Sequence, residues 1–281
     1  GLFRVRQFVQ DDTHIFVAPE GLEDELGAVV DFGLFLLREF GFSDFHVGLS
    51  VRDPANTDKF LGTDDQWDSA EVALRRVAAT RGLEPEVMFG EAKFYGPSLD
   101  IHVRDALGRL WQCTTVQIDF NAPDRFDLEY VGTEGDRHRP LVVHRALIGS
   151  YERFIGVLTE HFAGAFPVWL APVQAILLPI ADRHLEYADQ VATRLREAGL
   201  RVDVDGRREK VNAKIRDAQM QKVPYMLVVG DKEIESDAVS VRLRSGENLG
   251  PVPVNQFLDS ARQVVETRSL DAALTQPLVA G

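Results

Sequence analysis

A change of sequence pattern at residues 166–172 constrains the fold of this chain more than any other feature. Two prolines there enclose the apolar stretch Val-Trp-Leu-Ala, a composition typical of a linker between domains. Beyond the linker, apolar strands alternate with amphipathic helices, which predicts right-handed βαβ units and a largely parallel or mixed sheet. The predicted strands are 173–180, 201–204, 225–229 and 239–244, and the predicted helices are 185–195, 210–221 and 254–267. We therefore expect one domain over residues 1–168 and an α/β domain over residues 169–281.

The first domain has the pattern of an antiparallel sheet with one face buried. Apolar and polar side chains alternate through residues 98–104, as they do in a strand with one side on the core and the other in solvent. Helices are predicted over residues 18–40 and 64–81, and the second begins at a capping box formed by Thr63 and Gln66. Strands and helices therefore contribute to one layered α+β domain.

Polar residues interrupt a predicted strand over residues 109–120 that is otherwise suited to the interior. Buried polar groups need hydrogen-bond partners, so this strand predicts a polar pocket on the sheet. The residues concerned are Gln112, Thr114, Gln117 and Asp119.

Composition limits the class of protein. The 281 residues, 45% of them hydrophobic, suffice for about two domains with real cores. The net charge of −13 argues against binding along a nucleic-acid backbone without regard to sequence, although a local basic patch remains compatible with it. One cysteine excludes an internal disulfide framework and, with no apolar run of about 18 residues, predicts a cytoplasmic protein that does not span a membrane. The chain begins at a glycine and not at an initiator methionine, so we expect it to be the downstream part of a longer protein.

The N-terminal segment carries the residue types of a substrate site. Residues 2–9 alternate as in a strand, with Arg4 on one face, and a carboxylate at Asp12 and an imidazole at His14 follow. Arginine makes forked contacts with phosphate, a carboxylate holds an ammonium group, and a neutral imidazole binds metal. An exposed edge strand with solvated charges explains the same residues equally well.

Several motifs make the chain resemble the class II aminoacyl-tRNA synthetases. Residues 1–16, which begin Gly-Leu-Phe-Arg-Val-Arg-Gln-Phe, resemble the second half of motif 2 and the segment after it. Residues 94–97 (Phe-Tyr-Gly-Pro), 112–120 and 144–154 resemble this class as it appears in threonyl-tRNA synthetase. Residues 223–233 resemble the C-terminal anticodon-binding domain of that family. The likeness covers nearly the whole chain in order.

The resemblance implies a fold and an activity. The fold is an incomplete α+β class II catalytic domain with an antiparallel sheet, followed by an α/β anticodon-binding domain. The family activates threonine with ATP and Mg²⁺ to an adenylate and transfers it to tRNA(Thr). It holds a catalytic zinc with one cysteine and two histidines, for which His14 and His144 are the matching residues. A metal that binds the substrate hydroxyl separates threonine from isosteric valine, which pocket shape alone cannot do.

The resemblance also implies roles for individual residues. Arg4 and Arg153 match the cations that clamp the ATP phosphates. The matching substrate contacts are Gln10, Asp12 and Tyr95 for threonine, Gln112 and Gln117 for ATP or the adenylate, and Ser150 beside Arg153 on the motif 3 helix. Glu233 and Arg242 match readers of anticodon bases, to which a carboxylate and an arginine can both hydrogen-bond. Arg208 stands where relatives often carry a smaller polar residue.

Some family features are missing from this sequence. By the resemblance, the motif 1 dimer helix, the first part of motif 2, the cysteine ligand and the editing domain all lie upstream of residue 1. Cys113 lies in a predicted strand and is expected in the core, and Ser98 replaces a common lysine. We therefore expect the isolated chain to bind zinc weakly and not to aminoacylate, and the homodimer of the full-length family to depend on the missing part. Two alternatives remain: a non-catalytic tRNA-binding or regulatory relative, and a class II synthetase for another amino acid such as proline.

Overall fold

The computed structural model describes residues 1–274, and the chain divides into two compact units. The first unit comprises Gly1–His161 and the second begins at Phe162. Each unit is built around its own sheet. Within residues 1–274, every helix is too short or too polar to cross a lipid bilayer.

The sheet of the first unit has six strands in the order β1-β8-β5-β4-β2-β3. All neighbours are antiparallel except β2 and β3, which are parallel. The strands are β1 (Thr13–Val17), β2 (Phe45–Val51), β3 (Glu86–Phe89), β4 (Ser98–Arg104), β5 (Leu110–Asp119) and β8 (Leu141–Ala146). The predicted antiparallel sheet is therefore present, with one parallel pair at its edge.

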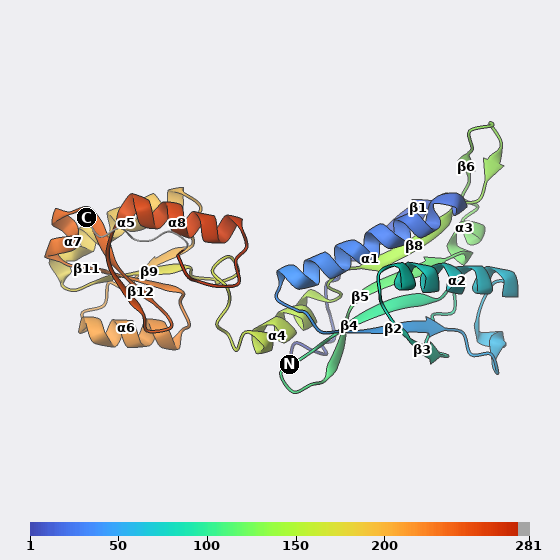
Figure 1. Ribbon diagram of the computed structural model, residues 1–281, viewed down its shortest axis with the longest axis horizontal. Coiled ribbons are helices and arrows are strands. Elements are labelled where there is room, and N and C mark those ends of the chain that lie inside the picture. Colours follow the sequence, from blue (N-terminus) through green and yellow to red (C-terminus); the bar gives the residue numbers. More distant parts are fainter. Residues whose placement is uncertain (275–281) are drawn as a thin grey trace. The chain divides into compact units, whose positions relative to one another are not determined.

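Two long helices cover one face of this sheet. Helices α1 (Leu22–Glu39) and α2 (Asp64–Thr80) lie beside each other across it (Figure 1). Beneath them lie the alternate apolar residues of β4, Leu99, Ile101 and Val103, all fully buried. Helix α2 begins as predicted, because Thr63 and Gln66 form a complete capping box. The alternating apolar residues thus determine which face of the sheet the helices bury, and the polar residues lie on the other face.

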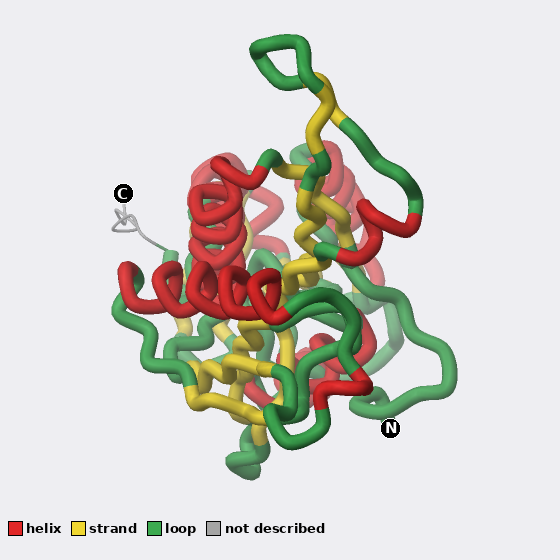
Figure 2. The backbone as a smooth tube through the Cα atoms, turned by 90° about the vertical axis from the view of Figure 1, so that its right-hand side faces the viewer, coloured by secondary structure: helices red, strands yellow, loops and turns green. Residues whose placement is uncertain are grey.

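Shorter elements complete the first unit. Helix α3 (Asn121–Arg125) follows β5, and α4 (Tyr151–His161) follows β8. Strands β6 (Tyr130–Val131) and β7 (Arg137–His138) form a two-stranded hairpin that projects from the unit (Figures 1 and 2). The sequence pattern predicts neither α3 nor this hairpin.

The strand predicted over residues 2–9 is wrong. This segment consists of turns and bends, and its pairing is limited to an isolated bridge between Gln10 and Ser150. A strand needs a neighbouring strand to pair with, and residues 2–9 form no ladder with any strand of the sheet, although β1 at its edge pairs only with β8. Of the apolar side chains here, Phe3 packs on Trp111, with ring centroids 4.7 Å apart, whereas Leu2, Val5, Phe8 and Val9 are exposed.

The second unit has a mixed five-stranded sheet in the order β10-β9-β11-β12-β13. Strands β10, β9 and β11 are parallel, and β12 and β13 continue the sheet antiparallel. The strands are β9 (Ala175–Pro179), β10 (Val202–Val204), β11 (Tyr225–Val229), β12 (Ala238–Leu243) and β13 (Asn248–Pro253). The predicted mixed α/β arrangement is confirmed, and β13 is an addition to it.

Helices pack on both faces of the second sheet. Helices α5 (Leu185–Glu197) and α8 (Val254–Glu266) bury one face, and α6 (Val211–Met220) buries the other (Figure 1). The short α7 (Asp231–Glu235) follows the end of β11. Leu177 packs in the core under α5 and α8, and Leu178 packs in the core under α6. Both side chains are fully buried. Strand ends and loops therefore offer most of the positions for functional groups in this unit.

Candidate functional site

A row of polar side chains crosses the open face of the first sheet. Residues paired directly across a sheet point to the same side, and the register pairs His14 with His144 and then His144 with Gln117. The row continues from Gln117 through Ser98 to Ser50. A pocket of about 730 Å³ lies over this face. The predicted polar pocket is therefore present, and strands far apart in the sequence build it.

A β-bulge brings Gln112 onto the same face as Gln117. The two positions differ by an odd number of residues, so a regular strand would point them to opposite sides. The pairing of β4 with β5 shifts by one residue beside Ile101, where a bulge places Gln112 opposite His102. Thr114 stays on the buried face. Both glutamines therefore line the pocket.

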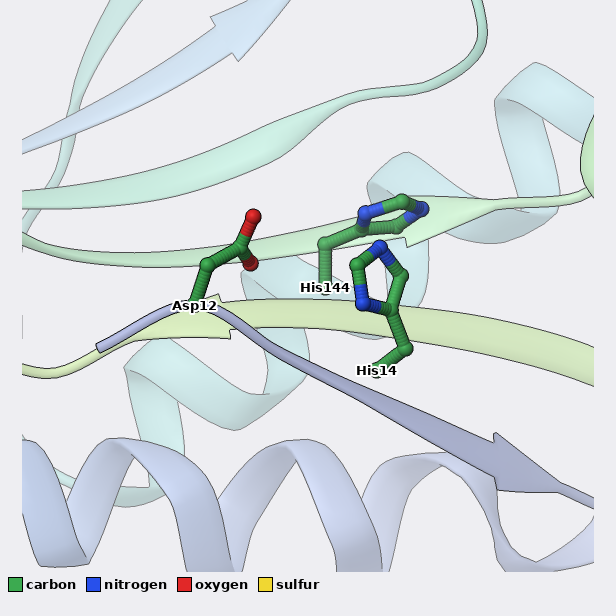
Figure 3. Close-up of side chains that lie close together, drawn as sticks. All are labelled: Asp12, His14 and His144. Atoms are coloured by element: carbon green, nitrogen blue, oxygen red, sulfur yellow. The ribbon is translucent and has the colours of Figure 1, made fainter. Parts of the chain in front are cut away.

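The two predicted metal ligands are neighbours at one end of the row. The ring centroids of His14 and His144 are 4.2 Å apart. With Asp12 they form a group whose potential ligand atoms all lie within 4.8 Å of one another (Figure 3). Two imidazoles and a carboxylate are donors that zinc accepts, so the group could hold a metal ion.

Asp119 orients one of these imidazoles. Its Oδ2 lies 3.0 Å from Nε2 of His144, which leaves Nδ1 as the nitrogen available to a metal. Burial works to raise the pKa of Asp119, but hydrogen bonds from His144 and from the backbone N–H groups of Asn121 and Ala122 outweigh it and lower the pKa. Asp119 is therefore an ionised acceptor at neutral pH, the usual partner of a metal-binding histidine.

Tyr95 closes the pocket beside the histidines. Its hydroxyl donates to Oε1 of Gln117 over 2.7 Å, and its ring centroid lies 5.3 Å from that of His144. Burial raises the pKa of Tyr95, and the carboxylates of Asp119 and Asp12 raise it further, so the phenol keeps its proton. The adjoining Gly96 permits this approach, because a Cβ there would lie 1.8 Å from the carbonyl oxygen of Ile118.

The two predicted phosphate-binding arginines line the same pocket. Arg4 lies in the irregular N-terminal segment, and Arg153 lies in the first turn of α4. The guanidinium of Arg153 is 5.5 Å from the ring centroid of Trp111, and its Nε donates to the carbonyl of Phe3 over 3.3 Å. The hydroxyl of Ser150 accepts from the backbone N–H of Arg153 over 3.1 Å. Ser150 thus caps α4 and also lines the pocket.

The structure brings the predicted residues of the first unit together. Arg4, Gln10, Asp12, Tyr95, Gln112, Gln117, His144, Ser150 and Arg153 all line the pocket, and His14 adjoins it through His144. Cys113 is in the core as expected, and burial raises the pKa of its thiol to about 12.

Sequence reasoning missed the role of Asp11. Its carboxylate accepts hydrogen bonds from the backbone N–H groups of Leu147, Ile148 and Gly149 over 2.7, 3.3 and 3.1 Å. It therefore fixes the loop between β8 and α4 that precedes Arg153. Adjacent acids at the start of a strand point to opposite sides, and this alternation is the only sequence signal that separates Asp11 from Asp12.

In the second unit, Arg208 and Glu233 lie at one edge of the sheet. Arg208 follows the end of β10 and pairs with Asp182, which follows the end of β9, at 3.0 Å. Glu233 follows the end of β11 and caps α7 by accepting from the N–H of Gly230 over 3.0 Å. An ion pair between Arg183 and Asp231, at 2.6 Å, joins the two segments. The carboxyl ends of parallel strands are a common place for ligands.

Arg242 has a different position. It lies in β12 opposite Met226, near the start of β11, whereas Glu233 lies beyond the other end of that strand. The register therefore does not place Arg242 at the edge that carries Arg208 and Glu233.

Comparison with protein families gives two matches. Residues 1–162 match the tRNA synthetase class II core domain (G, H, P, S and T), and residues 174–263 match an anticodon binding domain. The predicted boundary between residues 168 and 169 lies in the interval between these ranges.

Individual proteins and structures agree with these matches. The threonine–tRNA ligase of Acidobacterium capsulatum is 54% identical over 271 residues, which are 96% of this chain and 40% of that protein. The enzyme of that name from Thermus thermophilus is 50% identical over 271 residues, 96% of this chain and 41% of that protein. A crystal structure of the RNA binding domain of threonyl-tRNA synthetase from Cryptosporidium parvum superimposes with a TM-score of 0.88 at 38% identity, covering 94% of this chain and 66% of that one.

The chain thus spans about 40% of the length of the curated relatives it matches. Within that span, the family matches and the fold agree on a class II core followed by an anticodon-binding domain. We conclude that the chain belongs to the threonyl-tRNA synthetases.

Proposed function

We propose that the protein to which this chain belongs activates threonine with ATP and transfers it to tRNA(Thr). The observation that carries the proposal is the group formed by Asp12, His14 and His144 at the rim of a polar pocket. Glutamine, tyrosine and arginine side chains line the same pocket. This combination suits a small hydroxylated amino acid joined to a nucleotide.

The donor set fits the zinc that the family implies. His14 and His144 would hold the ion, and donation from Nε2 of His144 to Asp119 leaves Nδ1 of His144 available for it. When bound, zinc supplies open coordination positions for the amino and hydroxyl groups of threonine. Asp12 offers a carboxylate to the ammonium group of the substrate, and Tyr95 and Gln117, which hydrogen-bond to each other, line the same pocket.

Nucleotide binding falls to the other side of the pocket. Arg4 and Arg153 would bind the ATP phosphates, and Mg²⁺ would neutralise part of the phosphate charge. Gln112 would contact the nucleoside. The stacking of Arg153 against Trp111 holds the guanidinium in place before substrate arrives. Adenylate formation depends more on the positioning of threonine against ATP and on neutralisation of the phosphate charge than on a general base.

The second unit would recognise the anticodon of tRNA(Thr). Glu233 and Arg208 are at the edge where ligands of parallel sheets bind, and their side chains can hydrogen-bond to exposed base edges. Arg242 remains a candidate reader from its own position on β12.

Amino-acid selectivity tests the proposal. Calorimetric titration of the zinc-loaded chain with threonine, serine and valine should give binding of threonine and serine and at least about 100-fold weaker binding of valine. Removing the metal with a chelator should abolish the difference. Equal affinity for threonine and valine in the zinc-loaded chain would contradict the proposal.

A further inference from the structure

A buried carboxylate lies in the floor of the pocket. Asp100 is 6% exposed, and its two oxygens accept hydrogen bonds from four side chains on three strands. Oδ2 accepts from the hydroxyls of Ser50 and Ser98, both over 2.9 Å. Oδ1 accepts from Nε2 of Gln112 over 2.6 Å and from the hydroxyl of Thr115 over 2.9 Å.

This network determines which end of the Gln112 amide meets it. A carboxylate only accepts hydrogen bonds, so the NH₂ group, and not the carbonyl oxygen, must face Asp100. The hydroxyl of Thr115 gives its proton to Asp100 and therefore accepts the second N–H of Gln112, over 2.7 Å. Both amide protons are then used within the protein, and Oε1 of Gln112 remains.

Gln117 lacks such a constraint. Its partner is the hydroxyl of Tyr95, which can donate or accept. A flip of the Gln117 amide would keep a hydrogen bond to Tyr95, whereas a flip of Gln112 would set its oxygen against the oxygen of Asp100. The orientation of Gln112 is thus the one that the protein fixes before any ligand binds.

We propose that Asp100 is a positioning residue that presents Oε1 of Gln112 to the pocket as an acceptor for a hydrogen-bond donor of the nucleotide. The inference rests on the proposed binding of ATP. Two groups of ATP have this chemistry, a ribose hydroxyl and the exocyclic amine of adenine. The bulge beside Ile101 makes the arrangement possible, because it turns Gln112 toward Asp100.

Side-chain NMR tests the orientation without any ligand. In the wild-type chain, the Nε2 protons of Gln112 should exchange slowly with water and show nuclear Overhauser contacts to the methyl group of Thr115. A Gln112→Met variant assigns the signals. Both properties should be lost in Asp100→Ala, which leaves no acceptor for the Gln112 amide, and weakened in Thr115→Val, which keeps Asp100 should the first variant fail to fold. Unchanged Gln112 signals in both variants would overturn the positioning role.

The adjacent threonine provides a matched control. Thr114 lies on the opposite face of β5, where its hydroxyl donates to the carbonyl of Leu147 over 2.5 Å. Thr114→Val removes a buried hydrogen bond from the same strand without touching the Asp100 network. The signals of Gln112 should keep their wild-type exchange in this variant.

Nucleotide analogues test what the oxygen binds. Titration with ATP, 2′-deoxy-ATP, 3′-deoxy-ATP and ITP, all with Mg²⁺, should show one analogue binding about 5- to 10-fold more weakly than ATP, and its identity separates ribose from base. That penalty should fall to about twofold in Thr115→Val and Asp100→Ala and persist in Thr114→Val. If the same analogue bound equally weakly relative to ATP in the wild type and in every variant, the positioning role of Asp100 would be overturned, and the proposed function would stand. Failure of the wild-type chain to bind any nucleotide would instead contradict the proposed function.

Discussion

The two sheets of this molecule use their faces in opposite ways. The first sheet buries one face under α1 and α2 and carries a network of polar side chains on the other. The second sheet is buried on both faces, and its candidate ligand residues lie at strand ends. Side chains that stand on a sheet are placed by register, whereas those at strand ends are placed by loops. The first unit is therefore suited to exact positioning of a small substrate, and the second to a flexible nucleic-acid loop.

The largest effect should come from the doubly buried sheet. Leu177→Ala removes a fully buried side chain from the larger core of the second unit and should lower the free energy of unfolding of that unit by about 2–5 kcal/mol. Native-state hydrogen exchange measures each unit separately. Met220→Ala, at a side chain 76% exposed, is the control. Equal loss of protection in the first unit would show that the two units do not unfold separately.

Gly96→Ala tests the wall of the pocket in the first unit. The new Cβ would meet the carbonyl of Ile118, so the backbone must move, and we expect a loss of about 1–3 kcal/mol in the first unit only. Gly21→Ala is the control, because its Cβ would lie 3.4 Å from Val17, an ordinary contact. Thermal unfolding followed by calorimetry distinguishes them. A Gly96→Ala chain as stable as Gly21→Ala would refute the close approach.

A buried carboxylate in the turn between β4 and β5 should also make the stability of the first unit depend on pH. Burial opposes ionisation of Asp105, but hydrogen bonds from Trp111, Arg109 and Leu107 outweigh it and lower its pKa to about 2. Because the folded pKa lies below the unfolded value of about 4, the stabilisation is complete above pH 4 and lost as the pH falls toward 2. Denaturant unfolding at a series of pH values should therefore show a steeper acid loss for wild type than for Asp105→Asn. Parallel curves would exclude this group as a cause.

The smallest of these effects concerns a helix end. Thr63→Ala removes the capping box of α2 and should cost about 1 kcal/mol in the first unit, measured by urea unfolding. Ser69→Ala, at an exposed position within the same helix, should leave stability unchanged or slightly higher. A loss in Ser69→Ala as large as in Thr63→Ala would remove the cap as the explanation.

Local patterns predicted most of the fold. The alternation in β4 foretold one buried and one polar face, and the capping box marked the start of α2. Both signals are local, since each depends on residues a few positions apart. The strand expected over residues 2–9 is wrong, because alternation cannot show whether a segment lies alongside another strand.

The candidate site was less accessible to sequence reasoning. Motif resemblance named His14 and His144, but only the pairing of β1 with β8 makes them neighbours. The bulge that turns Gln112 into the pocket has no clear sequence signal. In a regular strand, the odd spacing between Gln112 and Gln117 would place their side chains on opposite faces. The network around Asp100 joins three strands, so it depends on register across the whole sheet.

Zinc binding by the chain tests the central claim most directly. With equimolar Zn²⁺ at concentrations high enough to fill a weak site, X-ray absorption should show one bound ion with imidazole nitrogens at about 2.0–2.1 Å, and His14→Ala or His144→Ala should weaken binding further, by at least about 10-fold. His138→Ala, in the projecting hairpin, should bind as wild type does. Zinc binding that survives both substitutions, or a bound ion without imidazole ligands, would contradict the account.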